Sequence, residues 1–262
     1  MNIDLTRKKA FVCGAGKGIG RATALELATL GASVTALARN EETLVHLCRA
    51  LKTSTKQKHD YLVADLSRSS VLKQSIAEHV EQNGPYHILV NNSAGPPPGL
   101  AYTANVEEFS AAFSQHLIAN HIMAQALLKG MKSEKYGRII NIISTSVKQP
   151  IHGLGVSNTI RGAVAAWAKT LATEVAIFGI TVNNLLPGAT ETDRLTEVLR
   201  AKAVRAKSSL EEIIEHEKSN IPAGRFGTPE EAAQVIAFLA SPAAAYINGI
   251  NVPVDGGRTG CL

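Results

Sequence analysis

The sequence predicts an α/β protein built on one doubly wound parallel sheet of about seven strands. Short apolar runs suited to buried strands recur along the chain, and stretches with helical spacing of apolar residues lie between them. Four glycines separate the first apolar run from the first helical stretch. The 262 residues suffice for a single core of this class, and no apolar run approaches the roughly 20 residues of a membrane span.

Seven apolar runs are predicted as strands, at residues 10–13, 33–38, 61–64, 87–90, 138–143, 180–186 and 250–254. Helices are predicted between them, at residues 22–30, 41–51, 69–82, 105–131 and 155–178, with a last one beginning at Thr228. Asn105 with Glu108 and Thr228 with Glu231 have the spacing of capping boxes. Ligands of such folds bind at the carboxyl ends of the strands, so the loops that follow the strands are the candidate functional segments.

The loop after the first strand has the composition of a phosphate-binding turn. Gly14, Gly16, Gly18 and Gly20 precede the first helix, and Lys17 and Ile19 lie among them. Glycine lets an anion approach the backbone, and the N–H groups at a helix start attract it. The spacing Gly14-x-x-x-Gly18-x-Gly20 differs from G-x-G-x-x-G, and the alternative is a tight connection without a ligand.

Composition limits the function classes. The net charge of +5 is mild and the basic residues are scattered, so we expect no nucleic-acid partner, although basic surface charge keeps that reading as a weaker alternative. Cys13, Cys48 and Cys261 lack the spacing of a metal site, and their odd number indicates a reducing compartment. The first residues lack the apolar core of a signal peptide. We therefore expect a cytoplasmic protein with no metal and no membrane contact.

Residues 189–227 interrupt the alternation of strands and helices. The segment is longer than a crossover requires, rich in charge and helical in composition. We predict an inserted helical lid over the binding site, and the alternative is a solvated helical excursion. Its cations hint at an anionic substrate, such as a phosphate, a carboxylate or an acyl-carrier thioester: Arg194, Arg200, Lys202, Arg205 and Lys207.

The loops together resemble the classical short-chain dehydrogenase/reductase family over essentially the whole chain. The matching segments are the glycine pattern from residue 14, Asp65-Leu66, residues 91–95, residues 141–144, Pro187-Gly188 with Thr192, residues 224–230 and residues 254–257. The resemblance implies one Rossmann-type domain over residues 1–262 that binds NAD(P). It implies these cofactor-binding residues: Gly14, Gly16, Lys17, Gly18, Ile19, Gly20, Arg39, Asp65, Leu66, Asn92, Arg161, Pro187, Gly188 and Thr192.

The end of the second strand decides which dinucleotide is expected. An acidic residue there would bind the adenosine ribose hydroxyls and repel a 2′-phosphate, but the chain has Ala38 followed by Arg39. Lys17 is expected to point toward the same place from the glycine loop. Two cations favour NADP(H), since a guanidinium binds phosphate well, and the alternative is a pair of solvated surface cations.

The catalytic positions depart from the family. The family's tetrad is Asn, Ser, Tyr and Lys, whereas the corresponding residues of this chain are His116, Ser144, Ser157 and Arg161. The YxxxK motif is therefore absent, and of the four residues only Ser144 matches. A phenol titrates near ~10, whereas the Ser157 hydroxyl is a far weaker acid, and a guanidinium effectively keeps its proton.

Two histidines are candidates to supply the missing proton. His116 and His152 are placed around the pocket by the resemblance, and imidazole titrates near neutrality. The alternative for each histidine is a structural role, in which its ring only makes hydrogen bonds. Losing a positioned acid costs on the order of 10²–10⁴ in rate.

Two functions from different classes follow. The first is an NADP(H)-dependent oxidoreductase, 3-oxoacyl reductase-like, acting on a carbonyl or alcohol, with Ser144 polarising the oxygen and Arg161 orienting the ribose. The second is a non-catalytic NADP(H)-binding sensor or partner protein. The resemblance also implies a homodimer or homotetramer formed through the helices at residues 105–131 and 155–178.

Overall fold

The computed structural model describes residues 1–54 and 56–261. Seven parallel strands form one sheet in the order β3-β2-β1-β4-β5-β6-β7. The strands are β1 (Lys9–Cys13), β2 (Ser33–Ala38), β3 (Asp60–Val63), β4 (Ile88–Asn91), β5 (Gly137–Ile142), β6 (Ile180–Pro187) and β7 (Asn251–Val254). The predicted class is confirmed: the strand order reverses direction between β1 and β4, which is where doubly wound folds bind ligands.

Nine α-helices are found in the described residues. They are α1 (Gly18–Thr29), α2 (Glu41–Ala50), α3 (Ser69–Asn83), α4 (Val106–Phe113), α5 (Ala119–Ser133), α6 (Gly155–Val175), α7 (Asp193–Ala206), α8 (Leu210–Ser219) and α9 (Pro229–Ala240). The predicted capping at Thr228 is present, because Thr228 Oγ1 accepts a hydrogen bond from Glu231 N and Glu231 Oε2 accepts one from Thr228 N. These reciprocal bonds satisfy donors that the helix start leaves free.

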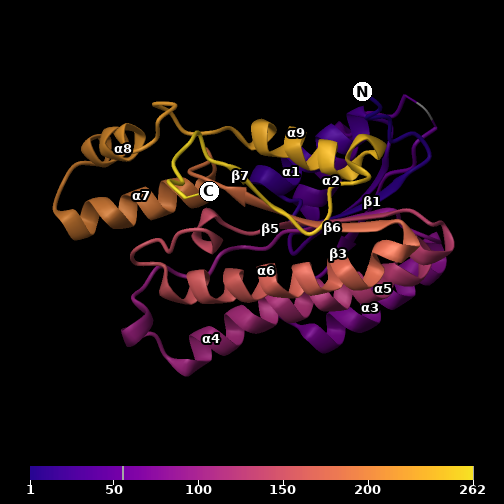
Figure 1. Ribbon diagram of the computed structural model, residues 1–262, viewed down its shortest axis with the longest axis horizontal. Coiled ribbons are helices and arrows are strands. Elements are labelled where there is room, and N and C mark those ends of the chain that lie inside the picture. Colours follow the sequence, from indigo (N-terminus) through magenta and orange to yellow (C-terminus); the bar gives the residue numbers. More distant parts are fainter. Residues whose placement is uncertain (55, 262) are drawn as a thin grey trace.

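Helices cover both faces of the sheet, as Figure 1 shows: α1, α2 and α9 lie on one side, and α3 to α6 on the other. One buried cluster joins Val12, Val34 and Ile88 to α1, α2 and α9. The second joins Phe11, Leu89 and Ile139 to α3, α5 and α6. Because neighbouring residues of a strand point to opposite faces, a strand covered on both faces is apolar throughout, which is why the strands appear in the sequence as continuous apolar runs.

A row of four asparagines crosses the sheet from β4 to β7. Asn91 donates to Asn141, Asn141 to Asn184 and Asn184 to Asn251, each at 2.9 Å between amide nitrogen and oxygen. The four residues are in register across the strands. Since a buried amide is costly unless it is hydrogen-bonded, the row favours this one register of the strands that lead to the candidate site.

The helix predicted over residues 105–131 is not uniform. A π-helical turn, Ser114–Ile118, separates α4 from α5. The turn carries His116, whose side chain is buried. Widened turns of this kind are frequent at functional sites, and an α-helical period in the sequence gives no signal for the change.

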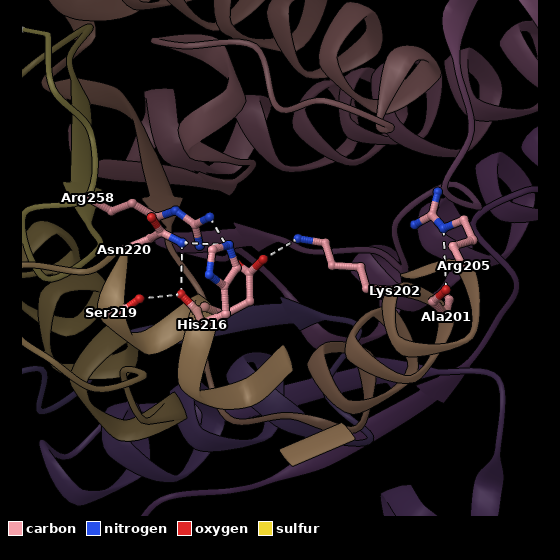
Figure 2. A network of polar contacts seen from close by, with 8 residues as sticks. Ala201, Lys202, Arg205, His216, Ser219, Asn220 and Arg258 are labelled. Atoms are coloured by element: carbon pink, nitrogen blue, oxygen red, sulfur yellow. Dashed lines mark hydrogen bonds and ion pairs between the residues drawn. The ribbon is translucent and has the colours of Figure 1, made fainter. Parts of the chain in front are cut away.

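The segment predicted as a lid forms α7 and α8, which project from one end of the molecule in Figure 1. Glu217 of α8 accepts hydrogen bonds from Lys202 of α7 at 2.7 Å and from Arg258 of the C-terminal segment at 3.0 Å. Figure 2 shows Lys202 and Arg258 pointing toward α8. Burial raises the pKa of Glu217, but these two cations outweigh it and the net pKa is lowered. These two hydrogen bonds connect α7 and α8 to each other and to the C-terminal segment.

Residues 1–54 and 56–261 contain neither a membrane-spanning helix nor a cluster of side chains suited to a metal ion. No helix there is both long and apolar enough to cross a membrane. No group of three or more histidine, cysteine or acidic side chains is arranged to hold a metal ion.

Candidate functional site

The glycine loop is shaped by close contacts that exclude a side chain. Gly14 and Gly18 have φ of +60° and +55°, a region that favours glycine. A Cβ on Gly20 would lie 2.2 Å from the Gly14 carbonyl oxygen, and the Asn92 amide donates to that oxygen at 3.2 Å. The predicted residues Gly14, Gly20 and Asn92 are therefore brought together, and they hold the loop at the carboxyl end of β1.

The start of α1 is free to receive an anion. No side chain caps this helix, and its first turn has no acidic residue, whereas Asn40 caps α2 and Thr192 caps α7. Ile19 packs against the core from this first turn. A Cβ on Gly18 would lie 3.1 Å from Thr192 Cγ2. Unsatisfied N–H groups, a glycine cradle and Thr192 opposite it fit a dinucleotide diphosphate.

The end of β2 offers a second, smaller cradle. A Cβ on Gly16 would lie 3.0 Å from Thr43 Oγ1 and 3.4 Å from Ala38 Cβ. Arg39 is exposed beside this position. Small side chains around Gly16 and an exposed guanidinium beside them fit the 2′-phosphate that distinguishes NADP(H).

Lys17 lies elsewhere than expected. Its Nζ is 3.0 Å from Asp193 Oδ2 at the start of α7, and both side chains are about seven-tenths exposed. The expectation that Lys17 points toward Arg39 is wrong for this structure, because Asp193 offers an opposite charge. That partner is 176 residues away and gives no local signal.

Asp65 and Leu66 follow β3. Hydrogen bonds from Ser67 lower the pKa of Asp65, and Arg39 and Arg68 lower it further, although partial burial opposes them. Leu66 is buried within the cluster under α3 and α5. Only the Asp65 carboxylate and the backbone are thus positioned to meet an adenine, and the Leu66 side chain serves the core.

Ser144 lies directly beyond the end of β5. Its Oγ accepts a hydrogen bond from Ser146 N at 3.1 Å, which leaves its hydrogen free for another acceptor. Pro187 and Gly188 end the adjacent strand β6, where Gly188 N bonds Val254 O. A Cβ on Gly188 would lie 2.7 Å from Asp255, so the close approach of these two backbones requires glycine.

Arg161 lies on α6 against the same strand end as Ser144. Its Nη1 donates to the Ile142 carbonyl oxygen at 3.0 Å, and its side chain is buried. Nε is fully buried with no partner among the described residues. Burial first, and the charge of Arg194 second, lower the pKa of Arg161 to about 10. Ser157 lies one turn earlier, half-buried, and its hydroxyl makes no hydrogen bond within residues 1–54 and 56–261.

His116 is held in its neutral form. Nδ1 lies 2.5 Å from Ser93 Oγ, while Nε2 is buried with no partner in the described part of the chain. Burial, and then the charge of Arg161, lower the pKa of His116 to about 2. An imidazolium is absent at neutral pH, so the hypothesis that His116 donates the proton is not supported by its environment.

The structure therefore places Ser144 just beyond the end of β5, where Arg161 binds the Ile142 carbonyl, and it places His116 where the charge of Arg161 acts on it. His152 is exposed in the loop before α6. Two relevant residues were missed by sequence reasoning. Ser93 binds His116, and Arg194, interpreted only as one of several lid cations, faces Arg161. Neither pairing has a sequence signal, since the partners are 23 and 33 residues apart with no shared period.

Comparison with known proteins gives matches over nearly the whole chain. The family model described as "Enoyl-(Acyl carrier protein) reductase" matches residues 14–259. The NADPH-dependent reductase BacG of Bacillus subtilis is 32% identical over 259 residues, covering 97% of this chain and 98% of BacG. The 3-oxoacyl-[acyl-carrier-protein] reductase FabG of Pseudomonas aeruginosa is 34% identical over 258 residues, with coverage of 97% and 98%.

A solved structure shows the same similarity in three dimensions. L-sorbose reductase from Gluconobacter frateurii, complexed with NADPH and L-sorbose, superposes with a TM-score of 0.92 at 27% identity, and each chain is covered completely. The chain is thus similar to reductases in its sequence and in its fold.

Proposed function

Because the chain belongs to the short-chain dehydrogenase/reductase family, we propose that it is an NADP(H)-dependent oxidoreductase acting on a carbonyl or alcohol through a non-standard catalytic centre. The prediction of an NADP(H) cofactor agrees with the NADPH-dependent relatives. The observation that carries the proposal is the Ser144 hydroxyl, whose hydrogen is free to donate beyond the end of β5, the strand whose Ile142 carbonyl Arg161 binds.

The residues that would hold the dinucleotide are those of the two glycine cradles. The loop of residues 14–20 and the uncapped start of α1 would bind the diphosphate. Arg39 would bind the 2′-phosphate, and Asp65 would lie at the adenine end. When bound, the reduced nicotinamide supplies a hydride to the substrate. Arg161 is expected to lie near its ribose, as the resemblance implies.

Ser144 and Arg161 act on the substrate oxygen. The Ser144 hydroxyl donates a hydrogen bond to the carbonyl oxygen, and the charge of Arg161 stabilises the negative charge that develops there. Neutral His116 and the weakly acidic Ser157 leave no positioned side-chain acid, so water delivers the proton. We expect turnover below that of a centre with a positioned acid by about 10²–10⁴-fold.

Turnover with NADPH tests this function. Oxidation of NADPH is followed by absorbance with aldehydes, ketones and oxoacids, and the Ser144→Ala variant is the control for the site. We expect slow turnover that Ser144→Ala abolishes while NADPH binding, measured by its fluorescence, remains. Turnover that survives Ser144→Ala would contradict the role of this hydroxyl.

A second function, a non-catalytic NADP(H)-binding sensor or partner protein, is favoured by one observation. His116 has a pKa lowered to about 2 by burial and by the charge of Arg161, so its imidazole is held in the neutral form. NADPH binding without oxidation of any carbonyl in the same assay would support this function instead.

We also propose that residues 189–227 act as a lid within a single domain and that the substrate is anionic. Tyr102, Val106 and Phe113 expose apolar surface at and before α4, which supports a homodimer or homotetramer through α4 to α6. A cytoplasmic location follows from the predicted reducing compartment, and light scattering measures the assembly.

A further inference from the structure

Arg39, at the end of β2, has two acidic residues close to it and is paired with neither. It is exposed and forms no ion pair in the part of the chain that the structure describes. Ala64 N donates to the Ala38 carbonyl oxygen at 3.1 Å, which brings Asp65 beside the arginine. Glu41 follows Arg39 by two residues. A guanidinium can bind a phosphate fully only while such carboxylates leave it free.

The backbone directs the side chains of Arg39 and Glu41 to the same side. Asn40, which lies between them, is extended, with φ of −100° and ψ of 113°. Side-chain direction alternates along an extended chain, so the residues on the two sides of Asn40 point the same way. Both side chains are long and exposed. Without another contact, the Glu41 carboxylate would therefore lie beside the guanidinium and repel a 2′-phosphate bound there.

Tyr61 of β3 supplies that other contact. Its hydroxyl donates to Glu41 Oε1 at 3.0 Å. This hydrogen bond, and then the charge of Glu41, raise the pKa of Tyr61. Tyr61 is in register with Ala36 of β2, two residues before the strand ends at Ala38, and its ring packs against the core cluster that includes α2. The partner of the Glu41 carboxylate is thus fixed by the sheet and is not Arg39.

The other carboxylates around the start of α2 have local partners. Asp65 Oδ1 accepts hydrogen bonds from Ser67 N at 2.9 Å and from Ser67 Oγ at 2.7 Å. Glu42 Oε1 lies 3.8 Å from His46 Nε2, one turn along the same helix. Glu41 differs from both, because its partner comes from a different strand, 20 residues away.

We propose that Tyr61 is a positioning residue for cofactor choice: its hydroxyl keeps the Glu41 carboxylate off Arg39, so that the guanidinium stays available for the 2′-phosphate. This inference rests on the proposed function, because it takes NADP(H) binding at the end of β2 as given. It adds a residue of β3 to the discrimination between NADPH and NADH. Tyr61 acts through Glu41, from the face of the sheet that α2 covers.

Fluorescence titration with NADPH and with NADH, without any substrate, tests this role. The quantity compared is the preference, which is the ratio of the NADH to the NADPH dissociation constant. Tyr61→Phe keeps the packed ring and removes the hydroxyl, and Tyr61→Phe/Glu41→Gln also removes the released charge. The matched control is Tyr61→Phe/Glu42→Gln, which removes the same charge from the same helical turn. Thermal unfolding checks that each variant is folded.

We expect Tyr61→Phe to lower the preference by about 2–5-fold, because NADPH must then break an exposed ion pair between Arg39 and Glu41 before its phosphate binds. Tyr61→Phe/Glu41→Gln should regain at least the wild-type preference, whereas Tyr61→Phe/Glu42→Gln should stay low. A purely structural role of Tyr61 would weaken both dinucleotides alike and leave the preference unchanged.

Three results would overturn the role of Tyr61: an unchanged preference in Tyr61→Phe, a loss that Glu41→Gln does not reverse, or an equal recovery with Glu42→Gln. Equal binding of NADPH and NADH by the wild type would contradict the proposed cofactor and this inference with it. Because no substrate is present, a lack of turnover would contradict the proposed oxidoreductase and leave the result for Tyr61 intact.

Discussion

The cofactor end and the catalytic end of this molecule lie along the same edge of one sheet, but they differ in what holds them together. At the cofactor end, the backbone conformation of Gly14 and Gly18 and the close approach of Gly20 to the Gly14 carbonyl define the cradle, and few side chains are needed. At the catalytic end, the arrangement depends on side chains: Arg161 binds the end of β5 that leads to Ser144, and its charge acts on His116. Of these residues only Ser144 matches the family's tetrad.

Such a chain can keep its ligand and change its chemistry. A Cβ on Gly14 or Gly20 would collide with neighbouring atoms at 2.7 Å or 2.2 Å, so these positions of the cradle require glycine. A centre made of side chains can exchange residues one by one while the strands beneath it stay in register through the asparagine row. The following variants test the cofactor end and the catalytic end independently of each other.

Restoring the family's acid should have the largest effect. In Ser157→Tyr/Arg161→Lys, a phenol and a neighbouring ammonium return to α6, and we expect reduction of a neutral ketone by NADPH to accelerate by about 10²–10⁴-fold. Steady-state kinetics measure the gain. The double variant Ser157→Phe/Arg161→Lys has the ring without the hydroxyl, and an equal gain there would show that the phenol hydroxyl is not the acid.

Arg39→Gln tests the cofactor end. Removal of the guanidinium should weaken NADPH binding by about 10–100-fold, the range for hydrogen bonds to a charged group, with NADH binding unchanged. Fluorescence titration with each dinucleotide measures both affinities. Arg49→Gln, at the other end of α2, is the matched control, and a parallel loss of NADH affinity would argue against a 2′-phosphate contact.

Glu217 tests how firmly α7 and α8 are held to each other and to the C-terminal segment. Its pKa is lowered in the folded protein, so its contribution is complete above the ordinary value of 4.5 and is lost as the pH falls through the lower folded pKa. Glu217→Gln should cost about 1–2 kcal/mol at neutral pH and little in acid. Urea unfolding across this pH range measures it.

The matched control for Glu217 is Glu215→Gln, because Glu215 pairs with Lys218 in an exposed i,i+3 pair on the same helix. We expect this variant to lose no more than about 0.5 kcal/mol. Equal losses of unfolding free energy in the two variants would mean that burial of Glu217 between α7 and the chain end adds nothing to stability.

Lys17 should show the smallest effect, although it lies inside the glycine loop. Its exposed pair with Asp193 is worth about 0.2–1 kcal/mol, so Lys17→Gln should lower the free energy of unfolding by no more than that. The preference for NADPH over NADH should stay close to that of the wild type. A lost preference would mean that Lys17 leaves Asp193 for the 2′-phosphate when the cofactor binds.

The sheet, the glycine cradle and the family could be predicted from the sequence alone, because these depend on local signals. Apolar runs covered on both faces are continuous, and helix caps such as Thr228 have a fixed spacing. Gly14 and Gly20 occur where a Cβ would collide, and Gly18 occurs where φ is positive. Each of these is visible within a few residues of chain.

Only the tertiary structure decided the charge state and the partners of the catalytic residues. Burial and Arg161 keep His116 neutral, Asp193 takes Lys17, and Arg194 converges with Arg161 over Gly95. The physical reason is that desolvation and Coulomb interactions depend on distances between residues far apart in sequence. Those distances exist only once helices α5, α6 and α7 have packed around the ends of the strands.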